Sequence, residues 1–427
     1  MDRYTGLIGI VLIFGIAFAM SNNRKAINYR VVLSGLGIQL LLALFILKTE
    51  LGKNIFGFLA TVVKKVLSFS DQGAEFVFGI IANKDAALTK VVGAQYSFIF
   101  FFRVIPTIIF VAVLISILYH LGIMQRVVKG FAWVVYKVMG VSGAEAVSNV
   151  GSAFVGQVEA QIMIKPYLKT MTMSELLASM TGSMACIAGG VMATYIALGV
   201  PAEYLLAASI MAAPGALVIS KIVWPETEVS ETKGKVLLEV KKTDANLVGA
   251  ISHGASDGLK IGLNVIAMLI GFIAIIGLLD YVLGKTGFFL ANNFHLSLDF
   301  INIDLKTLSL KQILGSLFAI FAWAMGVPHK DIQMAGSLMG TKMVLNEFVA
   351  YLDLIKVKGA MAHKTLVITS FALCGFANFS SIAIQVGGIG ELAPERRTDL
   401  AKLGVKALIC GTLASYLSAT IAGILTT

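Results

Sequence analysis

Long apolar runs recur along this chain and constrain its fold more than any other feature. A helix needs about 20 apolar residues to cross the hydrocarbon core of a bilayer, and a lipid-exposed span must satisfy its own backbone hydrogen bonds, which favours helices. Eight runs are candidates for complete crossings, at 5–20, 31–47, 97–120, 174–198, 203–222, 260–284, 363–390 and 402–425. The runs predict an all-α polytopic membrane protein with eight or so transmembrane helices.

The composition excludes most soluble classes. Of the 427 residues, 57% are hydrophobic and 14% are charged, compared with roughly 45–50% and about 25% in ordinary soluble domains. The 34 Lys and Arg residues outnumber the 24 Asp and Glu residues, which gives a net charge of +10. In a membrane protein this excess indicates anionic lipid as a partner and basic cytoplasmic loops, and not nucleic acid.

Neither the cysteines nor the histidines form a recognisable chemical motif. Cys186, Cys374 and Cys410 lie in apolar stretches without a CxxC spacing, and the five histidines show no HExxH pattern. A metal centre, a disulfide framework or a redox site would need such a pattern. We therefore expect no cofactor, no metal centre and no enzyme activity, and a membrane enzyme or a channel is the weaker alternative class.

Short basic loops indicate the orientation. Residues 21–30, 223–247 and 391–402 carry Lys or Arg, whereas the loop 199–202 carries none. Because basic loops remain in the cytoplasm, these three loops are expected inside, and both termini outside, a multi-pass protein of the cytoplasmic membrane. The first apolar run resembles a signal peptide, but its basic cluster follows the run, so we expect an uncleaved first helix.

Three segments are too polar to cross the membrane. Residues 53–93 and 122–138 have the pattern of amphipathic surface helices. Residues 224–247 form the most polar stretch of the chain, and we expect a mobile connecting loop there.

The second half of the chain repeats the layout of the first. Each half has an amide and a carboxylate in a broken hydrophobic hairpin, namely Gln157 and Glu159, then Asn346 and Glu347. Each pair is followed by an apolar span that small and polar residues interrupt, at 184–190 and 375–381. An odd number of crossings separates the halves, which makes the repeats inverted. Inverted repeats with interrupted helices are typical of secondary transporters.

The two hairpin carboxylates are the leading site candidates. Glu159 and Glu347 are flanked by apolar residues, and a charged, unpaired carboxylate at membrane depth is costly. They should therefore be neutral, paired or facing water. A substrate or proton site is the preferred interpretation, and a structural hydrogen bond that closes each hairpin is the alternative. The amides Gln157 and Asn346 are candidate ligand contacts or, alternatively, hydrogen-bonding groups between helices.

Five strings in the chain resemble the concentrative nucleoside transporter family. They are GQVEA at 156–160, MGVP at 325–328, GTKMVLNEFVAY at 340–351, GFANFSSIAIQVGGIG at 375–390 and APERR at 393–397. The order and spacing of the other predicted helices fit this family over essentially the whole chain. The resemblance implies a bacterial member that forms a homotrimer of elevator-type protomers. Two re-entrant hairpins and two broken helices would move against a scaffold in each protomer.

The resemblance also divides the chain and assigns roles to residues. It implies N-terminal scaffold helices with a surface helix at 1–96, a first inverted repeat at 97–222, a polar connecting loop with an amphipathic lead-in at 223–258, and a second inverted repeat at 259–427. It places Gln157, Val158, Glu159 and Val191 against the nucleobase, Glu347, Asn378 and Ser381 against the ribose, and Phe376 in the pocket lining. Carboxylate and amide groups suit vicinal hydroxyls, and an amide edge with an apolar wall suits a base.

The coupling ion is where this chain departs from the family pattern. In sodium-coupled members an Asn and a Ser side chain coordinate the ion together with two backbone carbonyls, and the matching positions here are Ser152, Cys186, Val155 and Ile187. A thiol is a poor ligand for a hard cation such as sodium. We therefore expect a degenerate sodium site and proton coupling, with Glu159 or Glu347 as the proton carrier, and sodium coupling is the alternative.

Two further departures lie on the first hairpin. Val158 stands where the family has Thr or Ser, and Gln161 stands where it has Pro. Loss of a hydroxyl beside the base favours a purine preference, with broad or pyrimidine specificity as the alternative. The resemblance thus implies a secondary active symporter that imports nucleosides.

Overall fold

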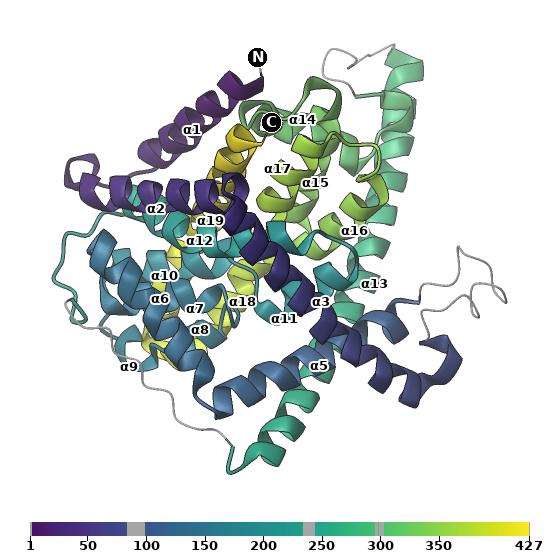
Figure 1. Cartoon of the computed structure of the whole chain (residues 1–427). Coiled ribbons are helices and arrows are strands. Elements are labelled where there is room, and N and C mark those ends of the chain that lie inside the picture. The colour runs from purple at the N-terminus through teal and green to yellow at the C-terminus, as the bar shows by residue number, and fades with distance from the viewer. Residues whose placement is uncertain (1, 83–98, 234–243, 295–297, 299–302, 427) are drawn as a thin grey trace.

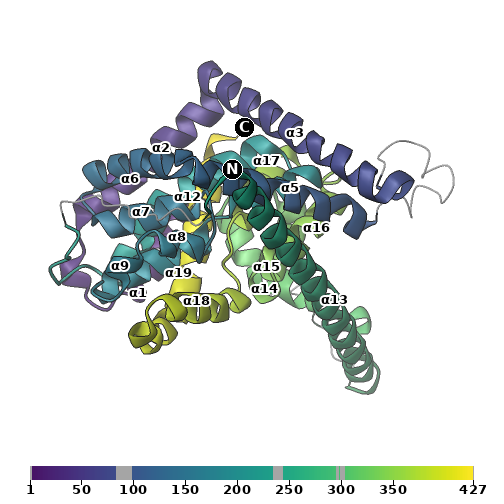
Figure 2. The ribbon, with the colours of Figure 1, turned by 90° about the horizontal axis from the view of Figure 1, so that it is seen from below.

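The computed structural model describes residues 2–82, 99–233, 244–294, 298 and 303–426. These residues form helices, and no strand occurs among them beyond an isolated bridge between Leu298 and Ile303. Both termini lie close together on the body, and α3 (Glu50–Phe78) and α13 (Leu247–Phe294) extend from it as two diverging arms (Figures 1 and 2). The predicted all-helical class is confirmed for this part of the chain.

Amphipathic helices occur where the sequence predicts them. In the N-terminal part, α1 (Asp2–Ala19) and α2 (Tyr29–Lys48) precede α3, whose buried residues include Phe56, Ala60 and Leu67 at helical spacing. α6 (Ile123–Met139) matches the second predicted surface helix. Helix α3 ends at Phe78 and is followed by a 3₁₀ turn to Ile81, and residues 83–93 of the first prediction lie outside the described residues.

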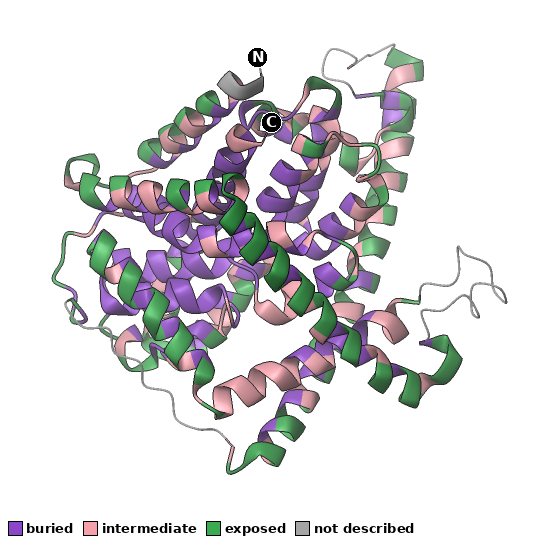
Figure 3. Ribbon diagram, in the orientation of Figure 1, coloured by how far each residue is buried: buried purple, intermediate pink, exposed green. Residues whose placement is uncertain are grey.

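Helices α5 (Phe100–His120) and α13 pack closely because glycines line their contact. A Cβ atom on Gly258 would lie 2.6 Å from the Cα atom of Ile109, and one on Gly254 would lie 2.8 Å from that of Val113. Larger side chains would force the two backbones apart. Most of α13 is exposed (Figure 3). The predicted span 260–284 is thus the middle of a 48-residue helix that presents apolar side chains outward.

Two helical hairpins contain the two amide and carboxylate pairs that the sequence analysis identified. The first consists of α7 (Gly143–Ser152) with the short helices α8 (Glu159–Ile162) and α9 (Lys165–Leu168), and the second of α15 (Ile332–Val344) and α16 (Glu347–Val357). A capping box begins α7, because Ser142 and Glu145 each accept a backbone hydrogen bond from the other.

Two predicted spans are interrupted. The 174–198 span is α10 (Met173–Ala185) and α11 (Gly189–Ala197), and the 363–390 span is α17 (His363–Leu373) and α18 (Phe379–Leu392). Each break begins at a buried cysteine, Cys186 or Cys374. Gly375 has a φ of 143°, and a Cβ atom there would lie 2.6 Å from the Ala185 carbonyl oxygen. The two breaks therefore touch, and this contact requires glycine.

Among the helices that are long and apolar enough to span a membrane, α12 (Ala202–Val223) and α19 (Arg397–Leu425) are the most buried, and they pack against each other beside α10 and α17. Figure 3 shows this buried centre surrounded by more exposed helices. Six helices of the described residues are long and apolar enough to cross a membrane. Two of the eight predicted runs are not among these six, because 5–20 corresponds to the shorter apolar helix Thr5–Ala19 and 363–390 to α17 and α18. Helix α14 (Leu310–Ala324), a short apolar helix of 15 residues, was not predicted.

The segment after α12 is not a mobile loop in its first part. Ser230 and Thr232 are buried. Ser230 donates to the Glu175 carboxylate at the start of α10, and Thr232 accepts backbone hydrogen bonds from Gly143 and Ala144 at the start of α7. Residues 234–243 lie outside the described residues. The prediction of a loop did not anticipate these contacts, which attach Ser230 and Thr232 to the starts of α10 and α7.

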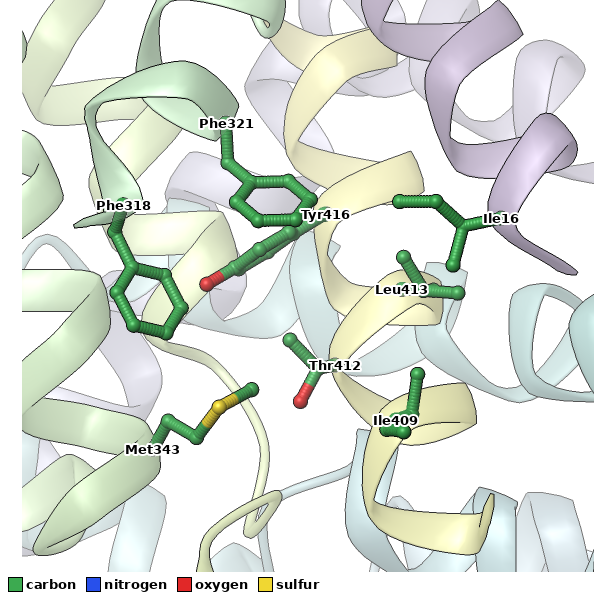
Figure 4. A pocket seen from close by; sticks show the side chains of 8 residues that line it. All are labelled: Ile16, Phe318, Phe321, Met343, Ile409, Thr412, Leu413 and Tyr416. Carbon is green, nitrogen blue, oxygen red and sulfur yellow. The ribbon is translucent and has the colours of Figure 1, made fainter. Parts of the chain in front are cut away.

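A small cavity of about 70 Å³ lies between α1, α14, α15 and α19 (Figure 4). Its walls are apolar, with Phe318, Phe321 and Met343 around the ring of Tyr416. The Tyr416 hydroxyl is buried and has no hydrogen-bond partner within the described part of the chain. The cavity has no charged group in its lining and lies apart from the predicted site residues.

Candidate functional site

Glu347 joins elements from both halves of the chain. It is the first residue of α16, at the tip of the second hairpin, and it is buried. Its Oε1 accepts a hydrogen bond from the Tyr195 hydroxyl of α11 at 3.0 Å, and its Oε2 accepts one from Asn378 Nδ2 of α18 at 3.0 Å. The carboxylate therefore lies where the two interrupted helices meet the second hairpin.

Asparagines shape the turns on either side of this carboxylate. Asn346 Oδ1 accepts from the Val349 N–H at the start of α16, and Asn378 Oδ1 accepts from the Ser381 N–H at the start of α18, each at 2.9 Å. Both are helix N-caps. Because the Asn378 oxygen is used in this way, its amide nitrogen is directed to Glu347. Asn346 thus serves as a cap, and Ser381, a predicted ribose contact, is buried close to Asn378.

A buried lysine and an aromatic stack surround the Glu347 carboxylate. Lys342 on α15 is buried, donates to the Ala372 carbonyl oxygen at 2.8 Å, and attracts the Glu347 carboxylate electrostatically. The Tyr195 ring lies 4.5 Å from that of Tyr351 and 5.5 Å from that of Phe348, measured between centroids. These side chains bury the carboxylate away from water, and a hydrogen bond is stronger in such a low-dielectric environment.

The first hairpin places its predicted residues against α18. Gln157 Oε1 lies 3.5 Å from Gln385 Nε2. Val158 packs on Gly388, where an added Cβ atom would lie 2.7 Å from Val158 Cγ2. The exposed Glu159 turns back to accept from the Val158 N–H at 3.3 Å. Since α18 also carries Asn378, this helix connects the first hairpin with the Glu347 group.

Val191 and Phe376 lie beside the two breaks and are half-buried. Val191 is in the first turn of α11, four residues before Tyr195, so the two share a helix face. The Phe376 N–H donates to the Cys186 carbonyl oxygen at 3.2 Å. The Gly189 N–H donates to the Phe154 carbonyl oxygen at 3.0 Å, which joins the first break to the first hairpin next to Val155 and Ile187.

Ser152 belongs to a fully buried polar cluster between the first hairpin and α10. Its hydroxyl donates to the Ser148 carbonyl oxygen at 2.8 Å and lies 3.0 Å from Ser183 Oγ. Gln161 closes the cluster by donating to Ser148 Oγ at 3.0 Å and to Ser183 Oγ at 2.7 Å, and by accepting from Ser179. The described residues hold no group of three or more His, Cys, Asp and Glu that could bind a metal ion.

Sequence reasoning missed Tyr195, Gln385 and the cluster around Gln161. Tyr195 and Gln385 lie in mainly apolar helices, and polar residues at membrane depth are a recognised signal for function. The partners that they contact are 152 and 228 positions away in the sequence, so only the fold identifies them. Together these groups offer a carboxylate, amides and apolar walls, which suit a small polar ligand.

Three family models match the chain in consecutive segments. The model of the Na⁺ dependent nucleoside transporter N-terminus matches residues 8–81, the nucleoside recognition model matches 101–202, and the Na⁺ dependent nucleoside transporter C-terminus model matches 204–423. The last of these alone covers more than half of the chain.

Similar proteins and structures agree with these models. Nucleoside permease NupC of Helicobacter pylori is 38% identical over 423 residues, which cover 98% of this chain and 96% of the permease. Sodium/nucleoside cotransporter 1 of Mus musculus is 37% identical over 440 residues, covering 99% of this chain and 64% of the mouse protein. CNTnw in an inward-facing substrate-bound state has a TM-score of 0.91 at 37% identity, covering 100% of this chain and 98% of CNTnw.

These relatives are transporters and not enzymes, and the helices found here are those of a multi-pass membrane protein. Between residues 8 and 423 the three family models leave only residues 82–100 and 203 unmatched, and both relatives are more than 30% identical to the chain. The chain belongs to the concentrative nucleoside transporter family.

Proposed function

We propose that this protein is a secondary active symporter that imports nucleosides across the cytoplasmic membrane and is driven by the proton gradient. The observation that carries the proposal is the buried Glu347 carboxylate, which neutral donors from Tyr195 and Asn378 hold at the tip of the second hairpin. Each carboxylate oxygen retains a lone pair after these bonds. A vicinal diol such as that of ribose can donate to both.

The two ends of the nucleoside would occupy different elements. Glu347, Asn378 and Ser381 bind the ribose, with Phe376 in the pocket lining. Gln157, Val158, Glu159 and Val191 face the base. The position of α18 supports this division, because Asn378 and Gln385 lie two turns apart on it and contact the second and first hairpins respectively.

Proton coupling is the proposed driving force. The hydroxyl cluster around Ser152 supports it, because Gln161 directs amide hydrogens at Ser148 and Ser183, and such donors do not suit a cation site. Cys186 supplies a thiol where sodium prefers oxygen, and its carbonyl oxygen already accepts from Phe376. Val155 and Ile187 would contribute only backbone carbonyls. Glu347 or Glu159 would carry the proton.

Sodium coupling is the second candidate, and the comparisons favour it. The matching family models describe Na⁺ dependent nucleoside transporters, and the mouse relative is a sodium/nucleoside cotransporter. In that case the backbone carbonyls near Val155 and Ile187, with hydroxyl or water oxygens, would hold the ion. This alternative would include broad or pyrimidine specificity. The purine preference is instead proposed because Val158 has no hydroxyl beside the base.

The assembly and its motion are also proposed. The long exposed α13 and the α3 arm would form a scaffold and the contacts of a homotrimer, and the hairpins would be re-entrant elements of a moving elevator domain. The division at residues 96, 222 and 258 would separate scaffold, first repeat, connecting segment and second repeat. Both termini would lie outside the cell, and their common location supports placing them on one side.

Uptake of radiolabelled adenosine into proteoliposomes tests the transport proposal. Unlabelled nucleosides should compete with the label, while free ribose and free nucleobases should compete weakly, because each fills only one end of the site. Failure of every nucleoside to enter or to compete would contradict the proposal.

A further inference from the structure

Gln385 is a fully buried amide that is not among the proposed nucleoside contacts. It lies on α18 with no exposed surface. Its Nε2 donates to the Met180 carbonyl oxygen of α10 at 3.2 Å and lies 3.5 Å from Gln157 Oε1 on the first hairpin. Its own Oε1 is buried without a hydrogen-bond partner among the described residues. Gln385 therefore stands between a fixed backbone group and a residue of the proposed base site.

The Met180 carbonyl determines how both amides are oriented. The two ends of a glutamine amide have nearly the same shape, so the surrounding hydrogen bonds decide which end lies where. A backbone carbonyl only accepts, so the NH₂ group of Gln385 must face Met180. The same NH₂ group faces Gln157, so Gln157 must accept through its side-chain oxygen. The NH₂ group of Gln157 is then left for a ligand.

We propose that Gln385 is a positioning residue that sets the nucleobase preference by directing the Gln157 NH₂ group to the base. The inference rests on the proposed function, in which Gln157 contacts the base. A group that only donates selects base atoms that accept. Cytidine and uridine differ by the exchange of an amino group for a carbonyl and of an acceptor ring nitrogen for an N–H, and so do adenosine and inosine. The site should therefore discriminate within each pair.

Gln385→Glu is the variant that reverses the arrangement. A buried, neutral Glu side chain would donate its O–H to the Met180 carbonyl and accept from the Gln157 NH₂ group, which turns the Gln157 oxygen to the base. In competition against radiolabelled nucleoside uptake, we expect the preferred member of each pair to exchange, with a shift of about tenfold in the ratio of inhibition constants. Gln385→Met, which has a similar size and no hydrogen-bonding group, should bring each ratio towards one.

A readout at the other end of the nucleoside separates positioning from general damage. The preference for ribonucleosides over 2′-deoxynucleosides depends on Glu347 and Asn378 and should stay unchanged in both variants. If Gln385→Glu does not fold, the Gln385→Met ratios decide the matter. Uptake with unaltered ratios in the folded variants would overturn the inference and leave the proposed function intact, whereas a parent protein that transports no nucleoside would overturn the proposed function itself.

Discussion

The Tyr195 hydroxyl donates a hydrogen bond to Glu347 at 3.0 Å and so connects the first interrupted helix with the tip of the second hairpin. The two residues are 152 positions apart and come from different halves of the chain. Both are fully or almost fully buried. This bond between the halves ties the position of the carboxylate to that of α11.

Removing this hydroxyl should weaken nucleoside binding. A hydrogen bond to a charged group contributes about 1.5–3 kcal/mol, so Tyr195→Phe should raise the KM for uptake by about tenfold or more while the protein still folds. Tyr351→Phe is the matched control, because Tyr351 stacks on Tyr195 but donates to the Ser370 carbonyl oxygen at 2.8 Å instead. Equal effects of the two substitutions on KM would contradict a direct role for the Tyr195 bond.

Neutralising Glu347 should nearly abolish uptake. Glu347→Gln replaces one acceptor oxygen by a donor, so the contact with Asn378 or Tyr195 is lost together with the charge-assisted bonds to the ribose, each worth about 1.5–3 kcal/mol. Asn378→Ala should act in the same direction, and Phe376→Ala should weaken binding with less effect on coupling. Initial uptake rates, with thermal unfolding as the folding check, measure this. Transport at the parent rate by a folded Glu347→Gln protein would remove the ribose assignment.

A hydroxyl at position 158 should alter base preference. Val158 packs on Gly388, one turn after Gln385, and no described residue bonds to Gln385 Oε1. Val158→Thr or Val158→Ser places a donor in this neighbourhood and should shift or broaden the preference between purine and pyrimidine nucleosides. Val158→Ala is the matched control for Val158→Ser, because both variants lose the two methyl groups and only Val158→Ser adds a hydroxyl. The inhibition profile of the common nucleosides reports the change, and an identical profile for Val158→Thr and parent would mean that this side chain does not face the base.

Restoring oxygen ligands should introduce a sodium response. Ser152→Asn combined with Cys186→Ser supplies an amide oxygen and a hydroxyl at the two positions where the family's sodium ligands are expected, and oxygen is the ligand that this hard cation prefers. We expect uptake by the double variant at constant pH to rise with sodium. The single variants serve as controls. Absence of any sodium stimulation in a folded, transporting double variant would show that these two positions do not define an ion site.

Much of the fold was predictable because apolar runs and their interruptions are local features. Helix α12, both interrupted spans and the amphipathic α3 and α6 follow from residue periodicity and from small or polar residues in apolar segments. Helix α14 was missed because Lys311 and Gln312 at its start shorten its apolar run, although the predicted run at 5–20 is similarly short. The length of α13 was missed because its polar first turns contact α5 through glycines, and such a contact depends on a distant partner.

The site was predictable only in part. The hairpin carboxylates stand out because charge is rare in apolar segments, and Asn378 was found because it interrupts a helix. Asn346 looked like a ligand, yet it caps α16, a role that depends on the backbone geometry of a turn. Tyr195, Gln385 and Gln161 act through partners in other elements. Their roles follow from tertiary packing, which a single sequence does not report.

The most direct test of the central claim is nucleoside uptake into proteoliposomes under separately imposed proton and sodium gradients. An inward proton gradient should drive accumulation, a lower external pH should raise the rate, a protonophore should collapse it, and replacement of sodium by choline should leave it unchanged. Steep sodium dependence at constant pH, with no response to the proton gradient, would contradict the account and show that backbone carbonyls and hydroxyls near Ser152 hold the coupling ion despite the thiol of Cys186.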